Sequence, residues 1–308
     1  GARGQGLARS AFANPWPLAP VQRMRPQSPA FIAATSPAED AAVLIFGIPF
    51  EGNVNLRKGA HRGPNAIRVA SDSIETYSPV LVRDLLDLPI ADLGNCHLPG
   101  GDPETQLASV AAQIEAELPA GRPTVMLGGD HTATVPVVKH YLRRFPSLRV
   151  VQFDAHTDLR PEFLGARFNY ASAMARLLEW LPPDHLYQIG PRSGTREEFE
   201  SRHTRLYPAH EIHPLDALRR TLPELAGCPV YVTIDIDVLD PSEAPGTGSP
   251  EPGGLRATEL AEALRLLAGC ELVGMDLTEV SPPWDPSGRT PILAAWLIRE
   301  AMLAWWGK

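Results

Sequence analysis

The sequence predicts an α/β fold in which a mainly parallel sheet is covered by helices on both faces. Short apolar runs of strand length alternate along the chain with longer segments of helical periodicity. This alternation is typical of βαβ units, whose crossover helices pack against a parallel sheet. Several apolar runs end in Gly or Asp, as strands that lead into loops often do. With 308 residues, 44% of them hydrophobic, the chain can form a sizeable core.

The elements follow in order along the chain. Strands are expected where an apolar run is short, at 42–48, 87–92, 124–128, 148–154, 186–190, 229–236 and 272–276. Helices are expected in the segments between and after these runs, at 103–118, 134–145, 170–181, 214–225, 257–268 and 290–305. The last helix carries apolar residues over a mixed face, among them Leu293, Trp296 and Met302.

Two regions of different composition define the expected domains. Residues 1–39 are rich in Pro, Ala and Arg and lack clear periodicity, so we expect an N-terminal arm that lies on the body or is partly disordered. Residues 40–308 contain no internal repeat or linker, and we expect one α/β domain there. The chain begins at Gly1, which leaves open an upstream leader, but no segment is typical of a signal peptide.

Composition excludes some partners. The formal net charge is −8, and a nucleic-acid partner is not expected because phosphate backbones are bound by a surplus of Lys and Arg. This balance is compatible with a small cationic substrate. No apolar run approaches the ~20 residues of a membrane-spanning helix, so no membrane partner is expected. Cys96, Cys228 and Cys270 form no CxxC pair, which favours a reducing, cytoplasmic location.

Three polar segments each follow an apolar run. Residues 128–131 read Gly-Gly-Asp-His, residues 154–158 read Asp-Ala-His-Thr-Asp, and residues 235–241 read Asp-Ile-Asp-Val-Leu-Asp-Pro. In open α/β sheets the ligand crevice lies beyond the carboxyl ends of the strands, where these segments are expected. Taken alone, an Asp-x-Asp pair is more often a turn or helix cap, and a Gly pair is a common turn former. A GxGxxG nucleotide-binding segment that opens a helix is absent.

The combination of these segments predicts a pair of metal ions. Asp154, His156 and Asp158 are spaced so that an extended backbone would point them to one side, and the pair 235 and 237 repeats this spacing. His131 can join them from a third strand. Several carboxylates in one crevice are unfavourable unless cations neutralise them. A carboxylate-rich, thiolate-free ligand set suits two Mn²⁺ ions better than structural zinc, and two such ions could hold a bridging hydroxide.

These motifs resemble those of the arginase/agmatinase/formiminoglutamase family. Further likeness lies in residues 244–250 (Ala-Pro-Gly-Thr-Gly-Ser-Pro), in the early segments 47–50 and 62–68, and in residues 276–282 (Asp-Leu-Thr-Glu-Val-Ser-Pro). The resemblance covers about residues 42–305. It implies a three-layer α/β/α domain around a largely parallel sheet, a ureohydrolase activity that splits a guanidino group into an amine and urea, and a homo-oligomer, either trimer or hexamer.

The resemblance also implies roles for individual residues. His131, Asp154, Asp158 and Asp235 would hold one ion, and Asp154, His156, Asp235 and Asp237 the other. The metal would be Mn²⁺, with Ni²⁺ or Co²⁺ as alternatives. Glu279 matches the carboxylate that binds the guanidinium, for which a charge-assisted pair is suited. Asp158 also matches the residue that passes a proton to the leaving amine. Ser249 matches a hydroxyl near the substrate.

One position departs from the family pattern. Many members carry a His about a dozen residues after the Asp-x-His-x-Asp segment, interpreted there as a proton shuttle or substrate contact, and Tyr170 stands at that position. A phenol of pKa ~10 donates hydrogen bonds but is a poor shuttle at neutral pH. Either the enzyme works without this group, or Tyr170 shapes the pocket for another substrate, or the protein is a non-catalytic metal-binding regulatory homologue. His97 is considered as a replacement relay.

Resemblance further favours agmatine, converted to putrescine and urea in polyamine metabolism, as the substrate. Residues 159–165 and 190–195 look more like agmatinases than arginases. Guanidinobutyrate, arginine, other guanidino acids, free guanidine and a formimino compound remain open. A dinuclear phosphoesterase would also gather Asp and His at strand ends, but its expected GNHD-like segment is absent. A deacetylase-like zinc site is a remoter alternative, which residues 235–250 disfavour.

Overall fold

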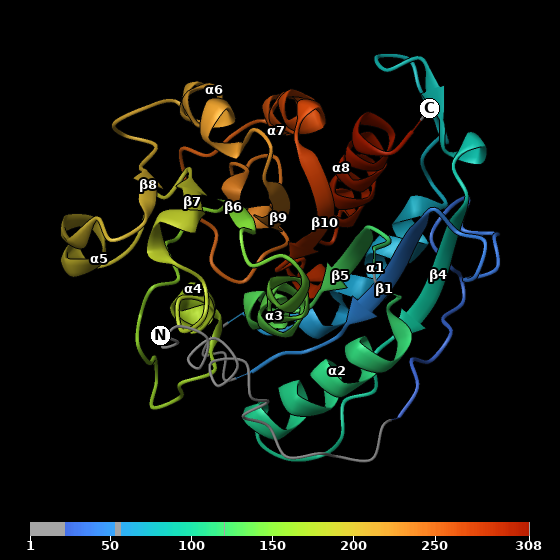
Figure 1. The fold of residues 1–308 in the computed structure, drawn as a ribbon, viewed down its shortest axis with the longest axis horizontal. Helices are drawn as coiled ribbons and strands as arrows, with labels where there is room; N and C mark the ends of the chain where they lie inside the picture. Colours follow the sequence, from blue (N-terminus) through green and yellow to red (C-terminus); the bar gives the residue numbers. More distant parts are fainter. Residues whose placement is uncertain (1–21, 53–56, 120, 308) are drawn as a thin grey trace, which may run out of the picture.

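The computed structural model describes residues 22–52, 57–119 and 121–307. Within these residues, eight strands form one sheet in the order β4-β1-β5-β10-β9-β6-β7-β8 (Figure 1). Each pairing between neighbouring strands of this sheet is parallel. The strands are β1 (Val43–Ile48), β4 (Ile90–Asn95), β5 (Thr124–Gly128), β6 (Arg149–Phe153), β7 (Leu186–Ile189), β8 (Arg205–Tyr207), β9 (Pro229–Asp235) and β10 (Glu271–Thr278).

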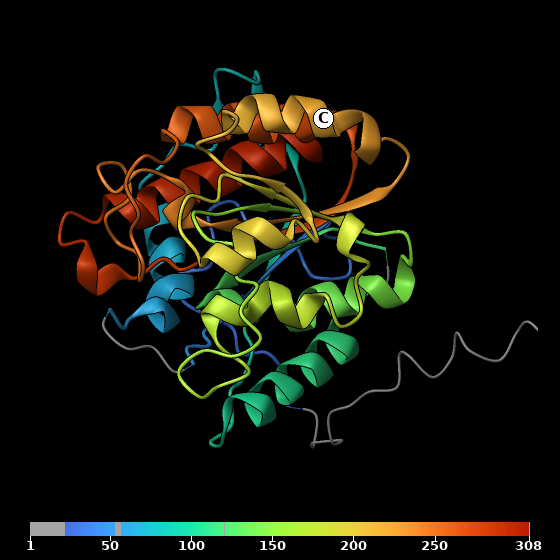
Figure 2. The same cartoon turned by 90° about the vertical axis from the view of Figure 1, so that its left-hand side faces the viewer.

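Helices cover both faces of the sheet, and Figure 2 shows the resulting three layers. One layer contains α1 (Gly63–Ser71), α6 (Pro214–Leu225), α7 (Ala257–Leu266) and α8 (Arg289–Trp305). The opposite layer contains α2 (Pro103–Glu117), α3 (Thr134–Arg144) and α4 (Ala173–Leu177). The short helix α5 (Arg196–Ser201) precedes the edge strand β8. The predicted three-layer α/β/α architecture is therefore confirmed.

The central strands are continuous apolar runs because each of their faces supports a separate core. All six residues of β1 are buried. Val43 and Ile45 pack into the core beneath α1 and α8, while Leu44 and Phe46 pack into the core beneath α2 and α3. Successive side chains of a strand point to opposite faces, so a sheet covered on both sides needs apolar residues at every position.

Several elements differ from the sequence prediction. The helix expected at 170–181 is a 3-10 turn, Tyr170–Ser172, followed by the five residues of α4, because the Asn169 side chain caps that turn and Ser172 leaves helical geometry. The strand expected at 87–92 begins later, at Ile90, because Asp84 caps a 3-10 turn over Leu85–Asp87. The prediction omitted α1, α5, β8 and a hairpin that pairs β2 (Tyr77–Ser78) with β3 (Arg83–Asp84).

Part of the expected N-terminal arm can be described. Residues 1–21 lie outside the described residues. Of the remainder, Arg25 forms a backbone bridge with Asn95 at the end of β4, and Phe31 is buried against the core. This segment therefore packs on the outer strand of the sheet. Among the described helices, none has the length and apolar character that crossing a membrane would require.

Candidate metal centre and substrate pocket

Four neighbouring strands deliver the predicted site residues to one edge of the sheet. His131 follows β5 in a 3-10 turn that Asp130 caps, its side chain accepting a hydrogen bond from Thr132 N at 2.9 Å. Asp154 directly follows β6, Asp235 ends β9, and Glu279 directly follows β10. These strands lie in the order β5-β10-β9-β6. The carboxyl ends of parallel strands meet at one edge, which brings together residues far apart in sequence.

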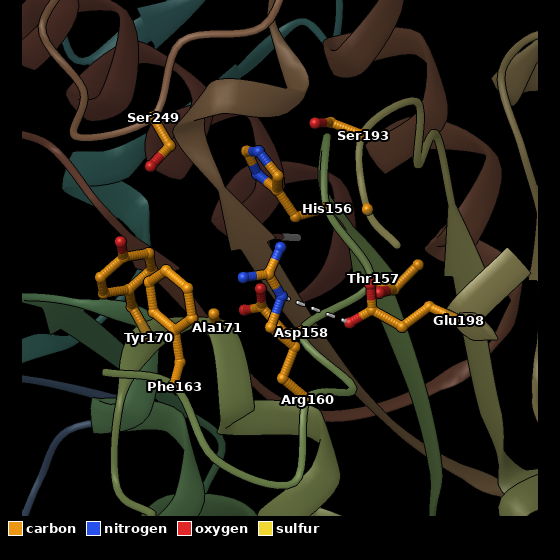
Figure 3. Close-up of a pocket in the computed structure, with 11 residues that line it drawn as sticks. His156, Thr157, Asp158, Arg160, Phe163, Tyr170, Ala171, Ser193, Glu198 and Ser249 are labelled. Atoms are coloured by element: carbon orange, nitrogen blue, oxygen red, sulfur yellow. Dashed lines mark ion pairs between the residues drawn. The ribbon is translucent and has the colours of Figure 1, made fainter. Parts of the chain in front are cut away.

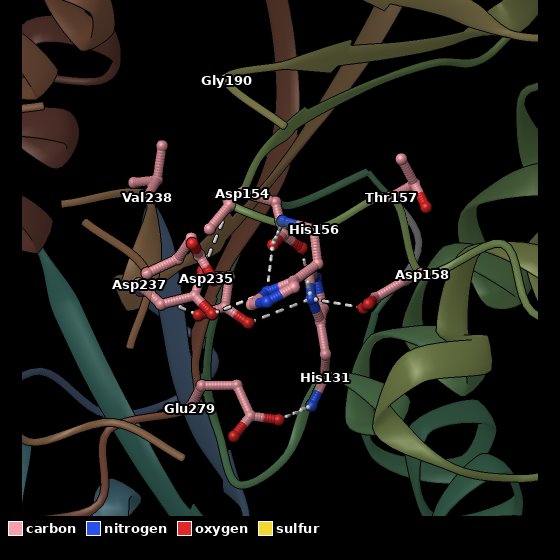
Figure 4. Close-up of polar contacts among 12 residues, drawn as sticks. His131, Asp154, His156, Thr157, Asp158, Gly190, Asp235, Asp237, Val238 and Glu279 are labelled. Atoms are coloured by element: carbon pink, nitrogen blue, oxygen red, sulfur yellow. Dashed lines mark hydrogen bonds and ion pairs between the residues drawn. The ribbon is translucent and has the colours of Figure 1, made fainter. Parts of the chain in front are cut away.

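The side chains form two overlapping groups of metal-type ligands (Figure 4). One group contains His131, Asp154 and Asp235, and the other contains Asp154, His156 and Asp237, with the ligand atoms of each group within 4.8 Å of one another. His131 Nδ1 lies 3.0 Å from Asp154 Oδ2 and 3.5 Å from Asp235 Oδ2, and His156 Nδ1 lies 3.0 Å from Asp237 Oδ2. Asp154 belongs to both groups, as a carboxylate shared by two cations must.

Asp158 reaches the same place by a different backbone path from the one predicted. Its Oδ2 lies 3.2 Å from His131 Nδ1, but it belongs to neither group. The expectation of an extended backbone through residues 154–158 is wrong, because β6 ends at Phe153 and Asp158 has a φ of 54°. Asp237 also departs from the expected extended geometry, because it lies in a 3-10 turn, Ile236–Val238. Left-handed backbone at a non-glycine residue costs about 1–3 kcal/mol and is concentrated at functional sites.

The hydrogen bonds of His131 show that a divalent cation fits this position. Thr233 donates its hydroxyl proton to buried Asp276 at 2.6 Å, so its oxygen accepts from His131 Nε2 at 2.8 Å. With its proton on Nε2, the neutral imidazole presents a lone pair on Nδ1. Nδ1 is buried without a hydrogen bond and faces the carboxylates of Asp154 and Asp158. A cation would satisfy this nitrogen and these carboxylates together.

Glu279 lies beside the first group. Its Oε1 accepts a hydrogen bond from His131 N at 2.9 Å. Its Oε2 lies near Gly248, where a Cβ atom would approach that oxygen to 3.3 Å. Its φ of 65° makes it a second left-handed residue of this site. The absence of a side chain at position 248 therefore leaves Oε2 room for a substrate group.

A cavity of about 160 Å³ opens next to these groups (Figure 3). His156 and Asp158 line it together with Tyr170 and Ser249, so the structure brings these predicted residues together. Its other lining residues are Thr157, Arg160, Phe163, Ala171, Ser193, Gly194 and Glu198. The Tyr170 ring packs edge-on against Phe163, with ring centroids 5.8 Å apart.

Comparison with known proteins agrees with this geometry. A model of the arginase family matches residues 41–304. The chain belongs to the arginase family. An agmatinase from Bacillus subtilis (strain 168) is 39% identical over 275 residues, which cover 89% of this chain and 95% of that protein. A guanidinobutyrase from Pseudomonas aeruginosa is 34% identical over 87% of this chain and 88% of its own length.

Solved structures of arginase-family proteins have the same fold. The proclavaminate amidinohydrolase of Streptomyces clavuligerus superposes with a TM-score of 0.82 at 31% identity, over 91% of this chain and 97% of that one. The predicted arginase-like fold and the resemblance to agmatinases are therefore confirmed. The prediction that the chain is a C–N hydrolase of this family is confirmed by the same relatives.

Sequence reasoning missed two charged residues of this arginase-family pocket. The Arg160 guanidinium lies 4.5 Å above the Phe163 ring and 3.9 Å from Glu198. Glu198 lies on α5, which begins with a capping box between Thr195 and Glu198. The Thr-x-x-Glu spacing is a sequence signal for such a helix start, but it gives no sign that the glutamate also faces a cavity.

His97, considered as a replacement proton relay, does not line this cavity. It follows β4, the edge strand, and β1 lies between β4 and β5. Gln113 of α2 holds its backbone, donating to His97 O and accepting from His97 N at 2.8 Å each. The relay hypothesis for His97 is therefore dropped.

Burial and the close spacing of charges shift the pKa values of these site residues. Burial alone would lower the pKa of both histidines, yet Asp154, Asp158 and Asp235 raise the pKa of His131 well above its ordinary value. Asp237 and Asp154 raise the pKa of His156 to about 12. Burial and the neighbouring Asp154 raise the pKa of Asp158 to about 7. Without a cation, protons neutralise this cluster.

A pH dependence of metal binding follows. A ligand must be deprotonated to bind a cation, and groups with raised pKa values still hold protons at pH 7. We expect binding to release at least two protons per protein at pH 7, one from each histidine and further protons from Asp158 and Asp235, and affinity to rise as the pH increases. Calorimetric titrations in buffers of different ionisation enthalpy give this proton count. Binding heats independent of the buffer would contradict the assignment of the two histidines.

Proposed function

We propose that this arginase-family protein hydrolyses a guanidino compound to an amine and urea with the help of two divalent cations. Mn²⁺ is the first metal to test, and Ni²⁺ and Co²⁺ are alternatives. The proposal depends on one observation, the two overlapping ligand groups that share Asp154 beside the buried carboxylate of Glu279. A carboxylate-rich set with two imidazoles and no thiolate favours Mn²⁺ over structural zinc.

We assign the ligands as follows. His131, Asp154, Asp158 and Asp235 would hold the first cation, and Asp154, His156, Asp235 and Asp237 would hold the second. When bound, such a pair would lower the pKa of a water molecule and supply hydroxide near neutral pH. Burial of these carboxylates supports the assignment, because buried charges need partners of opposite sign.

The chain's own residues would bind the substrate and move its proton. The guanidinium is planar and cationic, and Glu279 Oε2 can accept a charge-assisted hydrogen bond from it. Asp158 lines the cavity next to His131, so its carboxylate can accept and return a proton beside the substrate. It would pass that proton to the leaving amine. Ser249 and Tyr170 line the cavity and would contact the substrate.

Tyr170 is proposed as a substrate contact that does not shuttle protons. Burial, together with Glu279 and Asp158, raises the pKa of its phenol, which therefore stays neutral and acts as a hydrogen-bond donor. We expect Tyr170→Phe to raise KM about three- to tenfold and to change kcat by less than about threefold, the effect of one neutral hydrogen bond. Steady-state urea release measures both constants. A large fall in kcat with unchanged KM would instead assign the phenol to the chemical step.

Agmatine, which would yield putrescine, is the first substrate to test. The 39% identical relative from Bacillus subtilis is an agmatinase, and this supports the choice. Apart from His156 and Asp158, which are assigned to the cations, the cavity is lined by one cationic side chain, Arg160, and one anionic side chain, Glu198, so it could accept a substrate tail of either sign. Guanidinobutyrate, arginine and guanidine therefore belong in the same panel.

The test is urea release from this panel after metal removal and reloading with Mn²⁺, Ni²⁺, Co²⁺ or Zn²⁺. Metal-dependent urea from one compound, lost in Asp235→Asn, would establish the activity and its substrate. No urea from any compound, with two cations still bound, would contradict it and leave the regulatory homologue, for which Tyr170 is the supporting observation. A cytoplasmic location and a trimeric or hexameric assembly stay predictions.

A further inference from the structure

A row of buried hydrogen bonds runs across three neighbouring strands and ends on Asp154. Thr204, directly before β8, donates to Gln188 Oε1 at 2.7 Å. Gln188 of β7 donates through Nε2 to Gln152 Oε1 at 2.6 Å, and Gln152 of β6 donates through Nε2 to Asp154 Oδ2 at 2.6 Å. Gln188 Nε2 also donates to Thr157 O at 2.6 Å. Both glutamine side chains are buried, and the two residues are paired in register between their strands.

The donor and acceptor groups at its end fix the direction of the hydrogen bonds in this row. An ionised carboxylate and a peptide carbonyl only accept hydrogen bonds. Asp154 therefore requires the NH₂ group of Gln152, which turns the carbonyl of Gln152 toward Gln188. Thr157 O and Gln152 Oε1 together require the NH₂ group of Gln188, which leaves its carbonyl to the Thr204 hydroxyl. Both amide orientations follow from these acceptors, and each donor points toward Asp154.

The row also fixes the plane of the shared carboxylate. Asp154 Oδ2 accepts from Gln152 and lies 3.0 Å from His131 Nδ1, on the side of the first ligand group. Asp154 Oδ1 accepts from His156 N at 2.6 Å and lies 3.6 Å from His156 Nδ1, on the side of the second group. Each oxygen thus uses one lone pair for a hydrogen bond and keeps another for a cation.

We propose that Gln152, held in orientation by Gln188 and Thr204, is the positioning residue that directs the two oxygens of Asp154 toward different cations. The inference rests on the proposed binding of two cations. Without the Gln152 donor, the Asp154 carboxylate could rotate and give both oxygens to one ion, which weakens the other site. Outer groups that orient metal ligands commonly change metal affinity when they are removed.

The test is Gln152→Leu, which replaces the amide with an apolar side chain of similar size and so removes the donor. Metal-free protein is titrated with Mn²⁺ by calorimetry, and electron paramagnetic resonance reports whether two ions are coupled. We expect one of the two affinities to fall about ten- to a hundredfold and the coupled signal to weaken at stoichiometric metal. Both affinities within about twofold of wild type, with the coupled signal intact, would overturn the proposal.

A matched control separates positioning from general destabilisation. Gln113 of α2 is also a fully buried glutamine. Its side chain contacts the backbone of His97, which follows β4, and of Ser109 in the same helix. Gln113→Leu should lower the melting temperature and leave both metal affinities unchanged. If Gln113→Leu weakened Mn²⁺ binding as much as Gln152→Leu, the effect would be general destabilisation and the proposal would fail.

Should Gln152→Leu not fold, Gln188→Leu carries the same test. It leaves the Asp154 contact possible but removes the group that holds the Gln152 amide in orientation, so the same affinity should fall by a smaller factor. Unchanged Mn²⁺ binding by folded Gln188→Leu would overturn the proposal. A wild-type protein that binds fewer than two cations would contradict the proposed function itself, which distinguishes the two failures.

Discussion

Asp154→Asn is expected to remove tight binding of both cations and with it the urea-forming activity. Asp154 is the one residue common to the two ligand groups found among the described residues. Asparagine has nearly the same size but replaces one ligand oxygen with an NH₂ group that cannot bind a cation. We expect kcat/KM to fall about a thousandfold or more, equivalent to roughly 4 kcal/mol of lost transition-state stabilisation. Metal content of the purified variant and urea release at saturating Mn²⁺ measure the two effects.

Asp92→Asn is the matched control for this variant. The side chain of Asp92 is also buried, but it lies in β4 and holds the Arg68 guanidinium, with Nε to Oδ2 at 2.7 Å. Breaking that buried pair leaves the guanidinium without its anionic partner, which costs about 3–5 kcal/mol of folding stability. The control should therefore melt at a lower temperature and still bind both cations. Full metal content in Asp154→Asn would refute the shared-ligand assignment.

Glu279→Gln is expected to lower kcat about a hundred- to a thousandfold while leaving metal binding in place. Gln keeps an oxygen that can accept from His131 N, as Glu279 Oε1 does now. It loses the negative charge that would pair with the guanidinium and with the positive charge on the attacked carbon. Charge-assisted contacts of this kind in a buried site contribute about two to three orders of magnitude to kcat. Urea release and Mn²⁺ stoichiometry, measured on the same sample, separate the two properties.

Glu300→Gln controls for the loss of a buried glutamate. Glu300 lies on α8, where it contacts Arg299 and Ser78 away from the cavity. The control should lose stability and keep kcat. If Glu279→Gln turned over substrate at the wild-type rate, Glu279 would not be the guanidinium carboxylate. A protein that binds metal without catalysis would show no urea in either form, which identifies the regulatory homologue.

The fold could be predicted because its signal is local and repeated. Residues such as those of β1 are apolar at every position, and this pattern indicates a strand buried on both faces. Short elements escaped the prediction for the same reason. The strand β8 has three residues, Arg205–Tyr207, and each of them pairs with a residue of β7. No periodicity can be read in so short a segment.

The candidate ligands could also be predicted, though their geometry could not. Each of His131, Asp154 and Asp235 stands at the end of an apolar run, and the carboxyl ends of parallel strands meet. The backbone at Asp158 was predicted wrongly, because β6 ends at Phe153 and Asp158 has a left-handed conformation in the loop that follows. Nothing in the spacing of residues 154–158 indicates that the fifth residue departs from extended geometry.

What the sequence determined by itself is the fold class, the arginase-family resemblance and the set of residues at the strand ends. What only the tertiary structure decided is how these residues support one another. The tautomer of His131 depends on Thr233 and Asp276, which come from two other strands. The plane of Asp154 depends on Gln152 and, through it, on Gln188 of the next strand. Hydrogen bonds between strands require a defined register, and register arises only when the sheet is assembled.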